Sequence, residues 1–420
     1  MPTVSLTTLL DERPPRGAPA APAAETLQPA ALPAVDVEGL YVHVPFCFHK
    51  CHYCDFYSIT RQNDERMGRF VDRVLAEAAQ WAAGPGPTVR PRTVFFGGGT
   101  PSLLPLPLMR RLVEGLKSRF DFADLAEWTV ETNPATAALD YCQMLRESGV
   151  DRLSFGAQSF DPAELKILER HHHPDDVARS VDLARTAGFD RINLDLIYAI
   201  PGQSLQSWEA SLSAAMALGT THLSCYGLTY EPNTPIAVRR RLGQLSAVVE
   251  EDVEVEMLRH TRLRLAAAGM EAYEISNYAA PGQACRHNLV YWTGGNYVGL
   301  GPSAASHVEG WRWRNRPHLG EWEDAVDARH LPAVEVEHLT PRRRAGELAM
   351  LMLRLTAGID YAAFSARTGL DAHSLFAETV TRLSGLHFVE DTGAALRLTD
   401  QALAVADAVA AEFLAAEEAQ

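Results

Sequence analysis

Three features are scarce in this sequence, and each absence excludes a class of protein. The 420 residues include only six cysteines, at positions 47, 51, 54, 142, 225 and 285, and no N-terminal pattern of a secretory signal peptide. This distribution disfavours a disulfide framework and suits a reducing compartment. No apolar run approaches the length of a membrane span. The net charge of −15 argues against a basic surface for nucleic acid. We therefore expect a cytoplasmic protein that neither spans a membrane nor binds nucleic acid.

The bulk composition is typical of a soluble globular protein. Hydrophobic residues make up 47% of the chain and charged residues 22%, and the length allows one large domain with smaller ones. The first 36 residues differ, because prolines alternate there with alanines without a period. Acidic Asp11, Glu12 and Glu25 disfavour a transit peptide. We expect residues 1–36 to form a disordered N-terminal extension.

After this extension, apolar β-prone runs alternate with amphipathic helical patterns. The expected strands cover residues 40–44, 93–96, 127–131, 152–155, 191–197 and 222–228, and the helices 64–83, 106–119, 139–148, 175–187 and 205–218. Strands that are apolar at consecutive positions and separated by helices indicate parallel β/α units. Six units in a row fit a barrel-like sheet or an open doubly wound sheet. Either arrangement places the chemistry at the carboxyl ends of the strands.

Three cysteines follow the first expected strand at the spacing C-x3-C-x2-C. Cys47, Cys51 and Cys54 form a soft-metal site with too few ligands to close it. A structural zinc site needs four ligands, and the missing one would have to come from neighbouring histidines such as His43, His49 or His52. A four-iron cluster held by three cysteines instead leaves one iron open for a cofactor or substrate.

Other chemically suggestive residues lie at or near the ends of the next expected strands. These are the run Gly97-Gly98-Gly99-Thr100-Pro101, then Glu131, Gln158 and Asp195. The glycine run lacks both the P-loop ending and the G-x-G-x-x-G spacing of dinucleotide folds. It suits close approach of the backbone to a small zwitterion. Because these residues all fall near strand ends, we expect them to share one site with the cysteines.

The cysteine spacing, the aromatic residue before the last cysteine and the Gly-Gly-Gly-Thr-Pro run together resemble the radical S-adenosylmethionine (SAM) superfamily. The resemblance implies a [4Fe-4S] cluster on Cys47, Cys51 and Cys54, with SAM on its open iron. The SAM contacts that it implies are Tyr41, Tyr53, Gly98, Gly99, Thr100, Glu131, Gln158, Arg170 and Asp195. Carboxylates can bind the SAM ammonium or ribose hydroxyls, and Tyr53 can pack against adenine.

Longer runs at residues 41–47, 96–102, 154–160 and 193–198 resemble the oxygen-independent coproporphyrinogen III oxidases and their relatives. Two departures favour the haem chaperone branch of that family. Phe56 stands where the oxidases carry a further cysteine, and residues 287–292 form the pattern H-N-x-x-Y-W. The resemblance implies haem binding, with His287 as an axial ligand and Tyr291 and Trp292 against the macrocycle. Cys285 is an alternative ligand of the haem iron. The alternative to a haem site is that the His-Asn pair before Tyr-Trp forms a hydrogen-bonded corner of the protein core. His171 to His173 are interpreted as a helix-end loop bordering the site.

The sequence therefore predicts an α/β protein with a radical-SAM-type partial (β/α)6 barrel and a small winged-helix-like α+β domain at the C-terminus. The expected boundaries are 37–245 for the partial barrel, 246–335 for an acidic helix and the aromatic-rich segment, and 336–420 for the last domain. By resemblance, the expected function is to bind haem and pass it to acceptor proteins, with an electron donor serving the cluster. The alternative is an enzyme that decarboxylates coproporphyrinogen III with a 5′-deoxyadenosyl radical.

Overall fold

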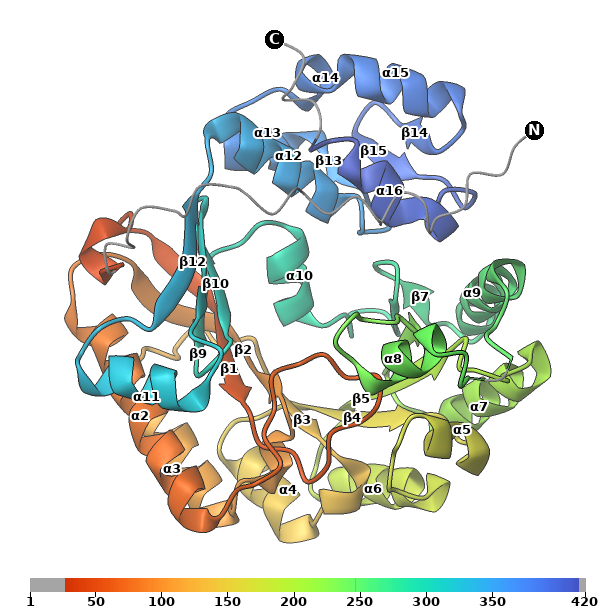
Figure 1. Ribbon diagram of the computed structural model, residues 1–420. Coiled ribbons are helices and arrows are strands. Elements are labelled where there is room, and N and C mark those ends of the chain that lie inside the picture. The colour runs from red at the N-terminus through yellow and green to blue at the C-terminus, as the bar shows by residue number, and fades with distance from the viewer. Residues whose placement is uncertain (1–26, 246, 415–420) are drawn as a thin grey trace.

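The computed structural model describes residues 27–245 and 247–414 of the chain. Six parallel strands form the core of one large sheet, in the same order in the sheet as in the sequence. These strands are β1 (Asp36–Val44), β2 (Thr88–Gly98), β3 (Glu127–Thr132), β4 (Arg152–Gln158), β5 (Arg191–Tyr198) and β6 (His222–Gly227). Helices connect them, so the sheet is built of successive β/α units (Figure 1). The expected parallel α/β class is confirmed.

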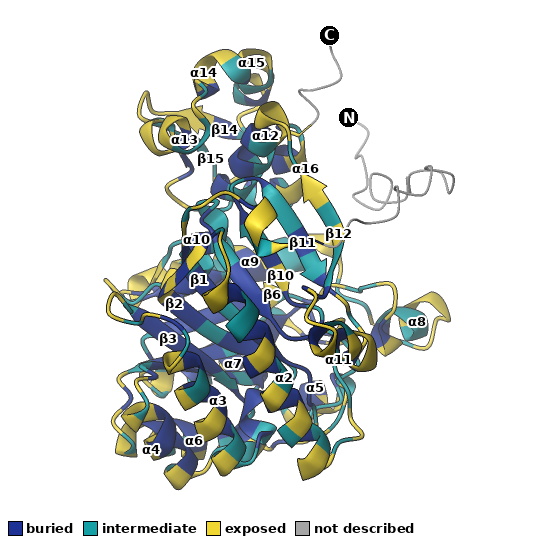
Figure 2. Cartoon of the chain, turned by 90° about the vertical axis from the view of Figure 1, so that its left-hand side faces the viewer, coloured by how far each residue is buried: buried dark blue, intermediate teal, exposed yellow. Residues whose placement is uncertain are grey.

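The connecting helices cover one face of this sheet. They are α2 (Asp64–Ala83), α3 (Leu106–Lys117), α4 (Leu139–Glu147), the short α5 (Pro162–Ile167), α6 (Pro174–Thr186) and α7 (Leu205–Ala217). Helix α2 shows why they form: Asn63 accepts a hydrogen bond from the Arg66 amide at its start, and acidic residues occupy its first turn. Its buried face includes Phe70, Val74 and Ala78. Figure 2 shows this division between buried inner and exposed outer helix faces.

Antiparallel strands extend the sheet at both edges. Its order is β12-β11-β10-β9-β1-β2-β3-β4-β5-β6-β8-β7. The added strands are β7 (Glu271–Ala272), β8 (Asn277–Ala279), β9 (Tyr297–Leu300), β10 (Ala305–Val308), β11 (Trp311–Asn315) and β12 (Ala333–His338). Strand β9 is the exception, because it pairs in parallel with β1, with Gly39 opposite Tyr297. The first strand of the core is thus flanked by a strand from the last third of the chain.

The described segment after the sixth β/α unit contains helices that do not connect the parallel strands β1 to β6. They are α8 (Pro235–Arg241), α9 (Glu251–Ala267), α10 (Arg286–Trp292) and α11 (Leu319–Asp327). Helix α10 carries the H-N-x-x-Y-W pattern and lies between the sheet and the C-terminal domain (Figure 1).

The C-terminal domain has its own hydrophobic core, which includes Leu348, Phe364, Phe376 and Leu383. Its elements are α12 (Pro341–Met352), β13 (Ile359–Asp360), α13 (Tyr361–Thr368), α14 (Ala372–Leu375), α15 (Ala377–Gly385), β14 (Val389–Asp391), β15 (Ala395–Leu398) and α16 (Ala406–Ala411). The three strands form a small antiparallel sheet in the order β13-β15-β14. The expected α+β domain, with helices followed by a hairpin, is confirmed.

The N-terminal extension was expected to cover residues 1–36, and residues 1–26 lie outside the described part of the chain. Residues 27–36 differ from the expectation, because they pack against the domain. Leu27 and Leu32 are buried, Pro29–Ala31 form a short 3-10 helix, and the Thr88 amide donates to the Val35 carbonyl. The apolar side chains in this stretch offset its proline content. Among the described residues, no helix combines the length and the hydrophobicity needed to span a membrane.

Candidate functional site

The three cysteines lie on a loop that leaves the carboxyl end of β1. The Cys47 amide donates to the Ile59 carbonyl at 3.0 Å, and the Ile59 amide donates to the Pro45 carbonyl at 2.8 Å, which closes the base of the loop. The Cys54 amide donates to the Cys51 carbonyl at 3.3 Å. All three thiols are free and half-buried. The loop therefore presents its sulfur atoms at the edge of the sheet where chemistry was expected.

The three sulfur atoms are not gathered as closely as ligands of a single metal ion. Among the described residues, one group has its donor atoms all within 4.8 Å of one another, and it does not contain these cysteines. Three thiolates on one zinc ion would lie about 3.8 Å apart, given Zn–S bonds of about 2.3 Å. His43 offers no help, because its ring nitrogens contact the Tyr41 hydroxyl at 3.1 Å and the Tyr57 carbonyl at 2.9 Å. The donor set fits a four-iron cluster with one open iron.

Two polar side chains point at the cysteine sulfurs. The Thr100 hydroxyl donates to Cys47 Sγ at 3.7 Å, and Arg170 Nη1 donates to Cys51 Sγ at 3.6 Å. Arg170 also donates to the Gly156 carbonyl. Burial raises the pKa of Cys47, and it raises the pKa of Cys54 to about 11, where the neighbouring thiolates add to the effect. Cationic iron is what would stabilise three thiolates at this place.

The glycine run is held against the strand that leads to the first cysteine. The Gly99 amide donates to the Val44 carbonyl at 2.8 Å, and the Thr100 amide donates to the Phe46 carbonyl at 2.7 Å. A Cβ on Gly99 would lie 2.7 Å from both of these carbonyl oxygens. Gly98 has a φ of +100°, and a Cβ there would lie 2.4 Å from the His43 ring. Glycine is therefore required at both positions.

Two half-buried carboxylates, Glu131 and Asp195, lie near this loop. Burial and the charge of Asp195 raise the pKa of Glu131 to about 8. Burial also raises the pKa of Asp195, although Ser154 and Asn193 donate hydrogen bonds to it at 3.0 and 2.9 Å. The charge of Arg170 offsets this rise for Asp195 only in part. A further cation, such as an ammonium group, would suit a position beside these carboxylates.

The remaining expected SAM contacts lie around the same edge. Gln158 ends β4 with a φ of +65°, a conformation unusual for a residue with a side chain. Tyr53 packs on a small cluster that includes Ile197 and Ile236. Tyr41 contributes to the buried interior, where burial raises its pKa. The structure thus brings the nine expected SAM residues to the cysteine end of the sheet or to the adjoining barrel interior.

The H-N-x-x-Y-W segment lies at the opposite end of the strands. Glu127, Arg152, Arg191 and His222 are the first residues of β3 to β6. The Glu127 carboxylate accepts hydrogen bonds from the His287 amide at 3.1 Å and from the Cys285 thiol at 3.2 Å. Arg152 donates to the carbonyl groups of the two residues before Cys285. Helix α10 is therefore fastened to the amino ends of the strands, away from the cysteines.

Both nitrogens of the His287 ring have partners. Nδ1 contacts the Thr93 hydroxyl at 2.9 Å, and Nε2 contacts the Tyr291 hydroxyl at 2.8 Å. Burial lowers the pKa of His287 to about 4, so the ring is neutral. Burial also raises the pKa of the Cys285 thiol strongly. The Arg354 guanidinium lies over the Trp292 ring, with its Cζ 4.9 Å from the ring centroid of Trp292.

A continuous file of aromatic rings joins the two ends of the barrel interior. Neighbouring ring centroids along it are 4.6 to 6.3 Å apart, within the range of favourable ring contacts. The file consists of His43, Tyr41, Phe95, His287, Tyr291 and Tyr297. It starts beside the glycine run and ends at a cavity.

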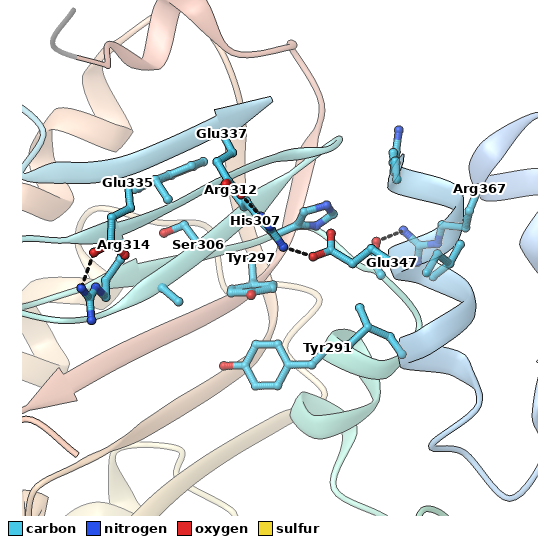
Figure 3. A pocket seen from close by; sticks show the side chains of 16 residues that line it. Tyr291, Tyr297, Ser306, His307, Arg312, Arg314, Glu335, Glu337, Glu347 and Arg367 are labelled. Atoms are coloured by element: carbon cyan, nitrogen blue, oxygen red, sulfur yellow. Dashed lines mark hydrogen bonds and ion pairs between the residues drawn. The ribbon is translucent and has the colours of Figure 1, made fainter. Parts of the chain in front are cut away.

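This cavity has a volume of about 580 Å³, within the range of about 300–1,000 Å³ common for small-molecule sites. It lies between strands β9 to β12 and helices α12 and α13 (Figure 3). Tyr291, Tyr297 and Leu348 supply apolar surface, and Arg312 and Arg367 supply positive charge. Arg312 is paired with Glu337 and Glu347 (Figure 3).

The sequence did not reveal His43, Glu127 or the cavity residues on β9 to β12 as parts of these sites. From the sequence, His43 was considered only as a possible zinc ligand. In the structure its ring packs against Gly98. Glu127 opens an expected strand with a charged residue at a position that proved fully buried. A charged residue at the start of an expected strand was the local signal that could have pointed to it.

Comparison with known proteins agrees with this geometry. The family model of the radical SAM superfamily matches residues 41–215, and the model of the HemN C-terminal domain matches residues 339–405. The heme chaperone HemW of Bacillus subtilis is 33% identical over 384 residues, which cover 90% of this chain and 99% of that protein. HemW of Mycobacterium tuberculosis is 36% identical over 90% of this chain and 94% of that protein.

HemW of Escherichia coli is 39% identical over 64% of this chain and 70% of that protein. Among solved structures, coproporphyrinogen III oxidase (HemN) from Escherichia coli superposes with a TM-score of 0.77 at 23% identity, covering 91% of this chain and 90% of that chain. That likeness shows the fold. Membership of the radical SAM superfamily implies a [4Fe-4S] cluster and SAM, which the cysteine and glycine loops fit. The chain belongs to the radical SAM superfamily and, within it, to the heme chaperone HemW family.

Proposed function

We propose that this protein binds haem and passes it to acceptor proteins, on a scaffold that also holds a [4Fe-4S] cluster and SAM. Its HemW relatives, which share a third or more of their residues with it, carry the name heme chaperone. The observation that carries the proposal is the cavity beside Tyr291, which joins the H-N-x-x-Y-W segment to a space of suitable size.

The cavity offers two kinds of side chain that haem needs, although glutamates line it as well. Haem is a flat macrocycle with two propionate groups, so it needs apolar walls and cationic side chains at one rim. Tyr291 and Tyr297 provide ring surface. Among the described residues, the partners of Arg367 are weak ones, Glu38 and the Gly294 carbonyl, each at 3.5 Å. Arg367 is thus the cavity arginine that is most readily available to a propionate.

His287 is the proposed axial ligand, at the cost of one hydrogen bond. Its Nδ1 contact with Thr93 is the kind of bond that orients a metal-ligating imidazole. The His287 ring is fully buried and does not itself line the cavity. Its Nε2 would therefore reach the iron only after the Tyr291 hydroxyl, which it contacts, moved aside. Cys285 is less suited, because its thiol donates to Glu127 and its raised pKa keeps it protonated. Trp292 lies outside the cavity lining, and its role would be to support α10 through Arg354.

The opposite end of the strands holds the proposed cofactor site. Cys47, Cys51 and Cys54 would each hold one iron, and the cluster would supply a low-potential electron from a donor. Glu131 and Asp195 would bind the SAM ammonium or ribose, while Gly98, Gly99 and Thr100 leave the backbone open to it. Tyr53 would pack against adenine, and Arg170 would position Cys51. The barrel interior separates this site from the haem segment.

Anaerobically reconstituted protein tests the proposal. Titration with hemin, followed by Soret absorbance, should show saturable uptake of one haem per chain, and mixing with an apo-haemoprotein should transfer it. The alternative is oxidase activity, and conversion of coproporphyrinogen III to protoporphyrinogen IX in the presence of SAM and a reductant would support that alternative. Absence of haem uptake would refute the chaperone proposal.

Substitution at the haem segment locates the site. His287→Ala should weaken haem binding at least about tenfold, as loss of a group at a metal commonly does, while the iron content of the cluster stays unchanged. His330→Ala is the matched control, because His330 is exposed and lies outside the cavity. Equal haem affinity in both variants would exclude His287 as the ligand.

A further inference from the structure

A second metal site is suggested by side chains that the cofactor site does not use. His49 lies between the first two cysteines, and Glu169 and His171 flank Arg170 on the loop after α5. One donor atom from each of these three residues lies within 4.8 Å of the other two. We propose that His49, Glu169 and His171 form a binding site for a divalent transition-metal ion such as Zn²⁺ or Fe²⁺, distinct from the [4Fe-4S] cluster.

The donor set is of the kind that such ions select. Two imidazoles and one carboxylate are common ligands of zinc and of non-haem iron, with further positions left to water. Metal–nitrogen bonds of about 2.0–2.1 Å place donor atoms about 3.3 Å apart. The three side chains are half-buried or exposed, so rotamer adjustments of about 1–1.5 Å can bring them to that spacing.

The surroundings of these residues favour the site. Nε2 of His49 is buried and has no hydrogen-bond partner among the described residues. The His49 and His171 rings already meet edge to face, with centroids 4.5 Å apart. Nε2 of His52 lies 3.6 Å from the Glu169 carboxylate and can orient it, as outer groups commonly do around metals.

The backbone of Glu169 supplies an independent argument. Its φ of +57° is in the left-handed region, just past the end of α5 at Ile167. Glycine is the residue usually found there, since a side chain costs about 1 kcal/mol or more in that conformation. The chain keeps a glutamate at a place where its backbone would favour glycine. A metal-binding role for the Glu169 carboxylate would account for that cost.

Binding there would tie two loops together. His49 belongs to the cysteine loop, whereas Glu169 and His171 flank the arginine that donates to Cys51 Sγ. Arg170 itself is turned towards Cys51 and the Gly156 carbonyl, so its charge is already directed away from an ion held by its neighbours. An ion in this position would fix the spacing between the cysteine loop and Arg170.

The test uses protein that already carries its cluster, so that the three cysteines are occupied. Such protein is dialysed against Zn²⁺ and then against metal-free buffer, and zinc and iron are counted by mass spectrometry. We expect one zinc per chain beyond the cluster, and at least about tenfold weaker zinc binding in His171→Ala. His173→Ala should keep the zinc, because His173 belongs to the same tract but caps α6 through the Asp175 amide.

Glu169→Gly separates metal binding from folding. It should lose tight zinc binding while its urea midpoint stays equal or rises, because glycine relieves the backbone strain. X-ray absorption at the zinc edge should show only nitrogen and oxygen neighbours. The proposal is overturned if the wild type retains no zinc, if His171→Ala or Glu169→Gly retains it as tightly as the wild type does, or if sulfur neighbours the zinc.

Discussion

Replacing Glu127 by glutamine removes the charge at the centre of the contacts that fasten α10 to the strands. The Glu127 side chain is fully buried and accepts hydrogen bonds from Arg152 at 3.3 Å and from Arg191 at 2.5 Å. Its other oxygen accepts from the His287 amide and the Cys285 thiol. The substitution therefore leaves a buried guanidinium without its counter-charge, next to the segment that carries the proposed haem ligand.

The magnitude follows from the burial of the pair. Arg152 is 1% exposed and Glu127 is 0% exposed, and removing one partner of such a pair costs about 3–5 kcal/mol. Burial alone would raise the pKa of Glu127, but the charges of Arg152 and Arg191 outweigh it and hold the pKa below its ordinary value. The folded pKa is the lower one, so the stabilisation is complete above the unfolded value of about 4.3 and is lost as the pH falls through the folded value.

Equilibrium unfolding in urea, followed by circular dichroism, measures the effect. Glu127→Gln should lower the free energy of unfolding by about 3–5 kcal/mol at neutral pH, and the difference from wild type should shrink below about pH 4. Asp121→Asn is the matched control, because it breaks an ion pair with Arg90 in which the side chains are 48% and 51% exposed. That pair should contribute about 0–1 kcal/mol. Equal losses in the two variants would refute the reasoning.

Three further predictions concern the cofactor end. Cys51→Ala should lose the cluster, read as iron and sulfide content, whereas Cys142→Ala should keep it; full iron in the first variant would contradict the assignment. Gly99→Ala should destabilise the fold by about 1–3 kcal/mol and lower iron content, because its Cβ would lie 2.7 Å from two carbonyl oxygens. A Cβ added at Gly385 would meet no atom within 4 Å. A similar loss of stability in Gly385→Ala would therefore count against that steric argument. Because the pKa of Glu131 is raised to about 8, binding of the SAM ammonium should release a proton near pH 7, and SAM affinity should rise with pH up to about 8. Calorimetry in buffers of different ionisation enthalpy should show this release, and its persistence in Glu131→Gln would place it elsewhere.

The parallel core could be predicted from the sequence because its signals are local. Residues 64–83 were expected as a helix and form α2 with those bounds, since their apolar spacing and the Asn63 cap specify both its face and its start. The pairing of β9 with β1 could not be predicted, because β9 is four residues long and its partner lies far away in the sequence. Pairing between such distant segments leaves no periodic pattern in either one.

The same distinction applies to the sites. The rule that parallel strands carry chemistry at their carboxyl ends led us to expect Cys47, Glu131 and Asp195 near one another. That they form one site stays a prediction. His287 follows a segment outside the β/α pattern, so no rule indicated that it would lie at the amino ends. Its two ring contacts and the nearby cavity depend on Thr93, Tyr291 and strands far along the chain. The residues proposed for SAM and haem stay predictions until the substitutions are made.

The parallel pairing of β1 with β9 constrains how the chain can fold during synthesis. Until the ribosome has passed residue 300, β1 lacks one of its two neighbours and presents an unpaired edge. Long-range pairings of this kind form slowly. The cysteine loop continues directly from β1, and α10 lies just before β9 in the chain. The strand that leads to the cysteine loop therefore gains its second neighbour only after the H-N-x-x-Y-W segment has been made. A nascent or truncated chain that acquired iron earlier would hold it on a strand paired along one edge alone.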